Sequence, residues 1–173
     1  DKDVATPAFF GSFKVLKNHD LSVRAFYKRM FRMPTFNDLY YTDMGNAFLK
    51  PEYAEQFNVG LKYTRNFEKS PFMRMLDVSV DAYYNKITDK IIAYPKGQQF
   101  RWTMLNLGEV EIKGVDAVLN TQFSLGKLEV TTKFQYTYQE AIDVTDPADT
   151  YYRDQIPYIP WHSGSAILAL FYK

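Results

Sequence analysis

Aspartates crowded into one short segment are the residues of this chain whose type and spacing most resemble a metal site. Asp143, Asp146 and Asp149 follow each other at three-residue intervals, and Asp154 comes shortly after them. Calcium prefers several carboxylate and carbonyl oxygens, so we treat Asp143, Asp146 and Asp149 as candidate calcium ligands. The spacing is not that of an EF-hand loop and no glycine lies among these residues, so a solvated acidic loop is the alternative interpretation.

Catalytic chemistry has few residues to draw on. The chain has no cysteine, no Gly-x-Ser-x-Gly and no phosphate-binding glycine loop. Its two histidines, His19 and His162, fall in a short turn and at the start of a strand, which we expect at opposite ends of the molecule. Glu109 and Glu111 share a strand face, but their separation in space cannot be read from the sequence. We predict that the chain is not an enzyme and carries no cofactor. A hydrolase is kept as the third interpretation of its function, after the two that are given later in this subsection.

Composition narrows the class of protein. Aromatic residues make up 17% of the 173 residues and hydrophobic residues 46%, while the formal net charge is +1. Tyrosine and tryptophan suit interfaces, because the ring is apolar and one end is polar. A charge so close to balance gives no electrostatic reason to bind nucleic acid.

Alternation of apolar and polar residues is the dominant pattern and predicts strands. From Leu76 to Asn85 one face is Leu, Val, Val, Ala, Tyr and the other is Asp, Ser, Asp, Tyr, Asn. No segment shows an apolar stripe of helical period, so we predict an all-β chain, an antiparallel up-and-down meander of about seven strands. Gly108 and Gly114 are candidate bulges. The expected strands are 8–16, 21–28, 56–64, 76–85, 102–124, 128–139 and 162–172.

The expected connections alternate between short and long. The short ones are residues 17–20, residues 68–71 and the turn at Gly126, and the long ones run over 30–52, 87–101 and 141–160. Aromatic residues gather at the long-loop ends of the strands. Tight turns on one side, long loops on the other and an aromatic girdle are typical of an outer-membrane barrel. No run of 18 apolar residues occurs, so any crossing of a membrane must use strands.

Seven strands leave two unpaired edges, which lipid does not tolerate. We therefore expect this chain to be a segment of a larger barrel, with any signal peptide outside it.

Four stretches stand out by their order and spacing: residues 31–40 (FRMPTFNDLY), residues 45–52 (GNAFLKPE), residues 106–116 (NLGEVEIKGVD) and, as a looser match, residues 156–162 (IPYIPWH). They resemble motifs of TonB-dependent receptors. The resemblance covers most of residues 21–165. Each motif alone is weak, but the four together, in this order and spacing, are specific for the family. It implies a 22-stranded barrel with a folded plug inside, which imports a scarce nutrient with energy supplied through TonB.

The resemblance also implies what surrounds the chain. We interpret residues 1–173 as one partial barrel domain from the C-terminal half of a receptor, without the plug and the TonB-contacting segment. Its expected location is the outer membrane of a Gram-negative bacterium. Its expected partners are outer-membrane lipid, a small-molecule nutrient (a metal chelate, cobalamin, haem or a glycan) and, through parts outside this chain, TonB and the plug. The alternative is a self-contained small barrel or adhesin-like protein with no transport role.

The motif residues have roles that follow from their chemistry. Pro34 and Pro51 end strand pairing where a loop begins or stops, and Gly45-Asn46 is a turn pair that tolerates positive φ. Arg32 could hold a carboxylate of the plug or of a neighbouring strand. Shaping the loop is the first interpretation of these residues, and direct ligand contact is the second.

Aromatic side chains in the long loops can stack on flat ligands and sugar faces. Residues 31–52 contain no histidine, which disfavours haem as the ligand. The expected ligand contacts are Arg32, Tyr40, Tyr41, Tyr94, Trp102, Tyr151 and Tyr152.

Overall fold

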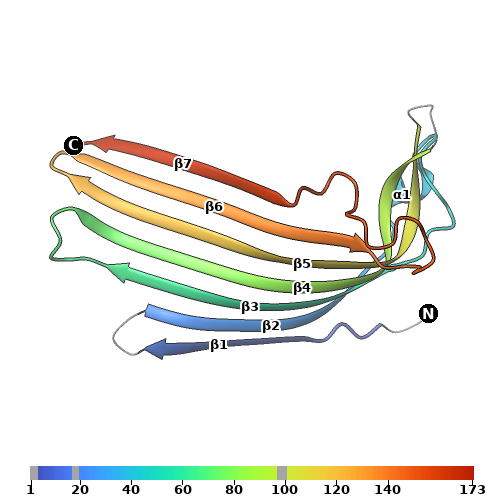
Figure 1. The fold of residues 1–173 in the computed structure, drawn as a ribbon, viewed down its shortest axis with the longest axis horizontal. Helices are drawn as coiled ribbons and strands as arrows, with labels where there is room; N and C mark the ends of the chain where they lie inside the picture. Colours follow the sequence, from blue (N-terminus) through green and yellow to red (C-terminus); the bar gives the residue numbers. More distant parts are fainter. Residues whose placement is uncertain (1–3, 17–19, 97–100) are drawn as a thin grey trace.

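Seven antiparallel strands form one curved sheet in the computed structural model, which describes residues 4–16, 20–96 and 101–173 (Figure 1). The strands lie side by side in chain order, so the predicted up-and-down meander of seven strands is confirmed. The turns at residues 67–72 and 126–127 lie at one end of the sheet, and the longer connections at residues 33–51 and 144–161 lie at the other, which we call the long-loop end and which also holds the helix α1 (Phe36–Tyr40). The strands are β1 (Ala8–Leu16), β2 (Asp20–Arg32), β3 (Glu52–Asn66), β4 (Met73–Lys96), β5 (Arg101–Leu125), β6 (Leu128–Asp143) and β7 (His162–Tyr172).

The strand register forms a continuous band of apolar side chains, to which all seven strands contribute, on one side of the sheet, which we call the apolar face. Val59 of β3, for example, pairs with Ala25 of β2 and Ala82 of β4. Toward the long-loop end this face carries a row of rings, with centroids 4.8 Å apart for Tyr27 and Phe57 and 6.5 Å apart for Phe57 and Tyr84. Many large side chains of this face, such as Val59, Leu61 and Phe134, are exposed within the chain, so they need an apolar environment from outside it.

The opposite side of the sheet, which we call the polar face, is joined by ion pairs and hydrogen bonds. Arg24 of β2 reaches across β3 to Asp81 of β4, with Nε 3.0 Å and Nη2 2.5 Å from the two carboxylate oxygens. Gly60 lies directly between them in the register. A Cβ at Gly60 would overlap Asp81 Oδ1, so only glycine leaves room for this bridge.

β4 and β5 are much longer than their neighbours and form a hairpin that extends beyond the sheet (Figure 1). β3 pairs with β4 only as far as Thr88, and β6 pairs with β5 only as far as Val110. The prediction of a long loop over 87–101 is therefore wrong for most of its length, because backbone pairing continues to Lys96 and Arg101. Residues 97–100 lie outside the described residues.

The register also corrects the expected bulges. Pairing of β4 with β5 runs without a shift past Gly108 and Gly114, and the shifts lie instead at 14–16 in β1 and 73–75 in β4. Gly114 is needed for a different reason: an added Cβ would overlap the backbone carbonyl oxygen of Tyr138 in β6 and would meet the Tyr83 ring hydroxyl at 2.5 Å.

The connections agree with the expected turn chemistry in part. Gly126 has φ of 63° in the two-residue turn between β5 and β6. Of the first short turn, residues 17–19, including His19, lie outside the described residues.

The loop between β2 and β3 holds a five-residue helix, α1 (Phe36–Tyr40), which the sequence did not predict. No helix in the described part of the chain is long and apolar enough to cross a membrane.

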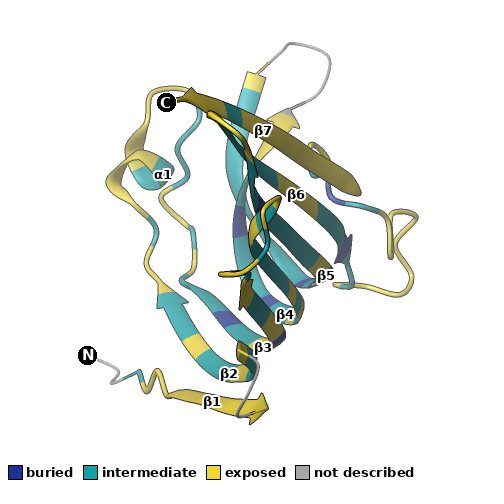
Figure 2. Ribbon diagram, turned by 90° about the vertical axis from the view of Figure 1, so that its left-hand side faces the viewer, coloured by how far each residue is buried: buried dark blue, intermediate teal, exposed yellow. Residues whose placement is uncertain are grey.

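A small buried core lies at the long-loop end of the polar face. Ile156, in the loop between β6 and β7, packs there against side chains of four strands. Figure 2 shows buried positions inside the sheet, whereas the edge strands β1 and β7 are almost wholly exposed. The loop is thus folded back onto the sheet rather than projecting from it. The core residues are Ala54, Ile87, Val110, Ile112, Ala141 and Ile156.

Candidate ligand-binding site

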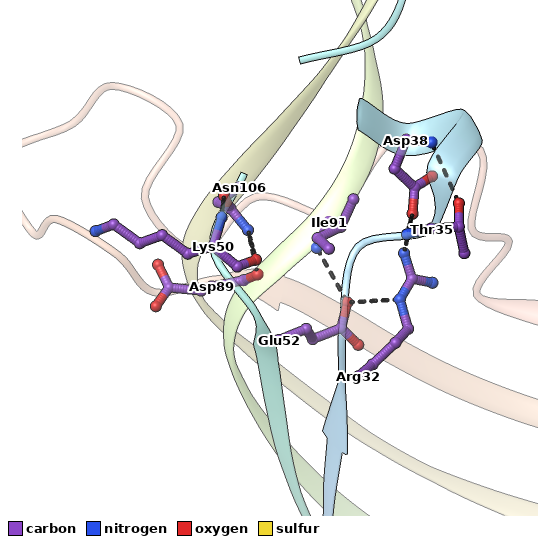
Figure 3. A network of polar contacts seen from close by, with 8 residues as sticks. All are labelled: Arg32, Thr35, Asp38, Lys50, Glu52, Asp89, Ile91 and Asn106. Atoms are coloured by element: carbon purple, nitrogen blue, oxygen red, sulfur yellow. Dashed lines mark hydrogen bonds and ion pairs between the residues drawn. The ribbon is translucent and has the colours of Figure 1, made fainter. Parts of the chain in front are cut away.

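Arg32, at the end of β2, holds two carboxylates at the long-loop rim (Figure 3). Its Nη2 lies 3.2 Å from Asp38 Oδ2, and its Nε lies 4.0 Å from Glu52 Oε2. Glu52 in turn accepts a hydrogen bond of 3.0 Å from the backbone N–H of Ile91 in β4. Arg32 therefore joins its own loop to the base of the hairpin, and the carboxylates it holds belong to that loop and to β3.

Asp38 also fixes the start of α1. The Thr35 hydroxyl accepts from the Asp38 N–H at 3.2 Å, and Asp38 Oδ2 accepts from the Thr35 N–H at 2.9 Å, which is a capping box. One carboxylate thus serves both the helix and Arg32. A helix of this length is not stable by itself, so these contacts hold it in place.

Asn106 of β5 ties the other end of the loop to the hairpin. Its Oδ1 accepts from the Lys50 N–H at 2.8 Å, and its Nδ2 donates to the carbonyls of Lys50 at 3.1 Å and Asp89 at 2.7 Å. Asn46 makes a further link, donating from Nδ2 to the Met104 carbonyl at 3.0 Å. We call Arg32, Asn46, Glu52 and Asn106 the loop clamp.

The loop clamp shows that three of the sequence motifs form one network. This supports the first interpretation of Arg32, that it shapes the loop. The positive φ of this loop falls at Asp43, with φ of 67°, and the Gly45-Asn46 pair does not use the positive φ that it tolerates. Gly45 is needed because a Cβ there would lie 2.7 Å from the Leu39 carbonyl oxygen.

A pocket of about 370 Å³ lies between the β4–β5 hairpin and the loop that joins β6 to β7. The hairpin supplies a mostly apolar wall, and the loop supplies carboxylates, an amide and a second tyrosine. The Gln155 side chain holds this loop, accepting from the Ala141 N–H at 2.9 Å and donating to the Ile159 carbonyl at 3.0 Å. The lining residues are Ile92, Tyr94, Leu105, Leu107, Asp143, Asp149, Tyr151, Asp154, Gln155, Ile156 and Pro157.

Two of the expected ligand contacts meet in this pocket. Tyr94 and Tyr151, which are far apart in the sequence, both line it and stay 42% and 65% exposed. The sequence did not identify Leu105 and Leu107 as pocket residues. No local pattern indicates that they lie opposite a loop about forty residues further along the chain. The apolar run that begins at Ile91 was a signal that the strand continues.

The other expected contacts lie elsewhere on the rim. Tyr40 packs on Phe36 within α1, with ring centroids 5.1 Å apart, and Trp102 packs on Tyr158 at 5.8 Å. Tyr41 is exposed and Tyr152 is half-buried. None of these four lines the pocket, so ligand contact by them stays a prediction.

The candidate calcium ligands do not converge. Asp143 and Asp149 line the pocket, whereas Asp146 accepts a hydrogen bond from the Ala148 N–H at 2.9 Å outside it. Within residues 4–16, 20–96 and 101–173, no three carboxylate or imidazole side chains are grouped closely enough to hold a metal ion. The geometry of the described residues therefore lends calcium no support.

Comparison with known families decides the class of protein. The family model described as "TonB dependent receptor-like, beta-barrel" matches residues 1–173. The chain belongs to this family. TonB-dependent receptors are transporters of the Gram-negative outer membrane and not enzymes, which confirms the predicted family, location and lack of enzymatic activity.

Two curated relatives are similar over part of the chain. One, named vitamin B12 transporter BtuB, from Vibrio vulnificus, is 32% identical over 99 residues, which are 57% of this chain and 14% of the relative. Another of the same name, from Photobacterium profundum, is 34% identical over 113 residues, which are 61% of this chain and 16% of the relative. This chain therefore spans only a small part of the length of either relative.

Membership of the TonB-dependent receptor family explains the two faces of the sheet. Strands of such a barrel alternate between side chains that face lipid and side chains that face the lumen. The apolar face meets the lipid requirement, since it carries no charged residue between Leu76 and Tyr84 of β4. The ring row of Tyr27, Phe57 and Tyr84 lies where the outer aromatic girdle is expected.

Proposed function

We propose that this chain forms part of the wall and outer rim of a receptor that imports cobalamin or a related corrinoid across the outer membrane. The observation that carries the proposal is the pocket at the long-loop end of a sheet with one apolar and one polar face. A solute entering from outside would reach this rim first. We further propose that residues 1–173 are one part of a larger barrel, whose plug and TonB-contacting segment lie elsewhere in the full-length protein.

The choice of ligand rests on similarity and on the chemistry of the rim. Both relatives described above are named vitamin B12 transporters. A corrinoid offers a broad apolar ring system edged with amides, and small-molecule sites are commonly apolar with a few placed polar groups. The wall of Ile92, Leu105 and Leu107 provides the apolar part, and Tyr94 and Tyr151 provide rings for stacking.

Uptake by the full-length receptor tests the proposal. The receptor would be expressed in a bacterial strain that lacks its own vitamin B12 receptor, and accumulation of radiolabelled cobalamin would be measured with and without TonB. We expect TonB-dependent accumulation. Receptor that reaches the cell surface but gives no TonB-dependent accumulation of cobalamin would overturn the choice of ligand.

Variants of the rim then locate the contact. We expect Tyr94→Ala and Tyr151→Ala to weaken cobalamin binding, by roughly tenfold each if a ring stacks on the ligand. Phe48→Ala is the control, because Phe48 is an exposed aromatic residue of the β2–β3 loop that does not line the pocket and is not among the expected ligand contacts. Equal losses for all three variants would contradict the assignment of binding to the pocket.

A further inference from the structure

The pocket between the hairpin and the β6–β7 loop has a strongly one-sided charge. Asp143, Asp149 and Asp154 all line it, and none of the described lining residues is a lysine or an arginine. Lys90 lines a separate, adjoining pocket of about 210 Å³, together with Tyr94 and Pro157. The larger pocket is therefore a region of negative potential.

The three carboxylates are not neutralised within the described part of the chain. Asp143 Oδ1 accepts from the N–H and the hydroxyl of Thr145, at 2.8 and 2.5 Å, and Asp149 Oδ1 accepts from the Tyr151 N–H at 3.0 Å. These bonds orient the side chains but bring no positive charge. None of the ion pairs found among the described residues includes any of the three.

The rest of the pocket is apolar or aromatic, apart from the Gln155 amide. Ile92, Leu105 and Leu107 line it from the hairpin, and Ile156 and Pro157 from the loop. Such a wall takes up an apolar ligand surface, while a carboxylate accepts hydrogen bonds but donates none. An anionic ligand would lose its hydration here and meet repulsion from like charges.

We infer that this pocket is a charge-selective subsite. It accepts a neutral or cationic ligand that carries hydrogen-bond donors, such as amides or hydroxyls, on an apolar skeleton, and it rejects anionic chelates. This inference rests on the proposed function only for the identity of the ligand. The charge preference follows from the pocket itself and applies equally to a corrinoid and to a neutral glycan.

Charge-selective labelling of a cysteine measures this preference without a ligand. The chain contains no cysteine, so Pro157→Cys in the full-length receptor, with any cysteine elsewhere replaced, puts one reactive thiol on the pocket lining. Its rates of reaction with a trimethylammonium-ethyl and a sulfonatoethyl methanethiosulfonate would be compared. Phe48→Cys, at a position 92% exposed in the β2–β3 loop, corrects for the potential of the cell surface.

We expect the ratio of cationic to anionic labelling rates to be roughly fivefold to tenfold higher at position 157 than at position 48, for three carboxylates partly screened by salt. Asp149→Asn combined with Asp154→Asn should remove most of that excess. Asp146→Asn is the matched control, because Asp146 belongs to the same loop but does not line the pocket. A ratio at position 157 equal to that at position 48, or one that the double variant leaves unchanged, overturns the inference.

Ligand protection separates this inference from the proposed function. Cobalamin should slow labelling of Pro157→Cys, and a cobalamin monocarboxylic acid, in which one peripheral amide is hydrolysed, should protect more weakly. The double variant should reduce the difference between the two compounds. A high charge ratio without protection by cobalamin would contradict the proposed ligand and leave the charge-selective subsite standing, and equal protection by both compounds would count against selectivity.

Discussion

Replacing Asn106 by alanine should release the β2–β3 loop from the hairpin. The Asn106 side chain makes three hydrogen bonds, two with the backbone of Lys50 and one with the Asp89 carbonyl. Alanine removes all three and offers no replacement. Arg32, Asn46 and Glu52 remain in the loop clamp, so we expect local opening of the loop rather than unfolding of the sheet.

The size of the effect follows from the number of bonds. A hydrogen bond within a protein contributes about 1 kcal/mol net, and these three lie at a rim where water can replace part of each. We therefore expect the free energy of local opening to fall by about 2 kcal/mol, which corresponds to roughly thirtyfold faster amide exchange when exchange follows local opening. The Lys50 N–H, which donates directly to Asn106, should change most, and the Met104 N–H, which donates to the Met44 carbonyl at 2.9 Å, should follow it.

Hydrogen–deuterium exchange of the full-length receptor in detergent, read by mass spectrometry, measures this directly. Asn37→Ala is the control, since Asn37 lies in the same loop and its side chain makes no hydrogen bond within the described part of the chain. The reasoning is refuted if Asn106→Ala changes exchange of residues 44–52 by less than about threefold, or if Asn37→Ala changes it equally.

Two further substitutions test the faces of the sheet. Gly60→Ala should lower the free energy of unfolding by about 1–3 kcal/mol, because the new methyl group would displace Asp81 from its ion pair with Arg24. Gly11→Ala is the control and should be close to neutral, because nothing lies within 4 Å of the added Cβ. Urea unfolding of the refolded receptor compares the two variants. Val80→Arg puts a charge in the middle of the apolar face and should cost about 2–4 kcal/mol in a lipid bilayer. Ser79→Arg, one residue away on the polar face, should cost much less, and similar losses for both would argue against a lipid-facing assignment of the apolar face.

Most of the fold could be predicted because it depends on a local pattern. In β4, the alternation from Leu76 to Asn85 determines which side chains share a face, and a shift of one residue would put Asp77 and Asp81 among the apolar residues. The tight turn at Gly126 followed from the backbone freedom of glycine. These features need only a few neighbouring residues.

The missed features depend on pairing across long distances in the sequence. The alternation ends near Ile87, yet β4 continues to Lys96 because β5 supplies partners such as Leu105 for Ile92. The pocket was not predictable for the same reason, since Tyr94 and Tyr151 meet only after the β6–β7 loop folds back through Ile156. Sequence motifs did identify the loop clamp residues, although not the contacts among them.

The loop clamp holds mostly backbone atoms of its partners. Glu52 binds the N–H of Ile91, Asn106 binds main-chain atoms of Lys50 and Asp89, and Asn46 binds the carbonyl of Met104. Each of these partners could change its side chain in the course of evolution without loss of the contact. The rim could therefore acquire a new ligand preference by exchanging the residues that point into the pocket, while the frame that carries them keeps its shape.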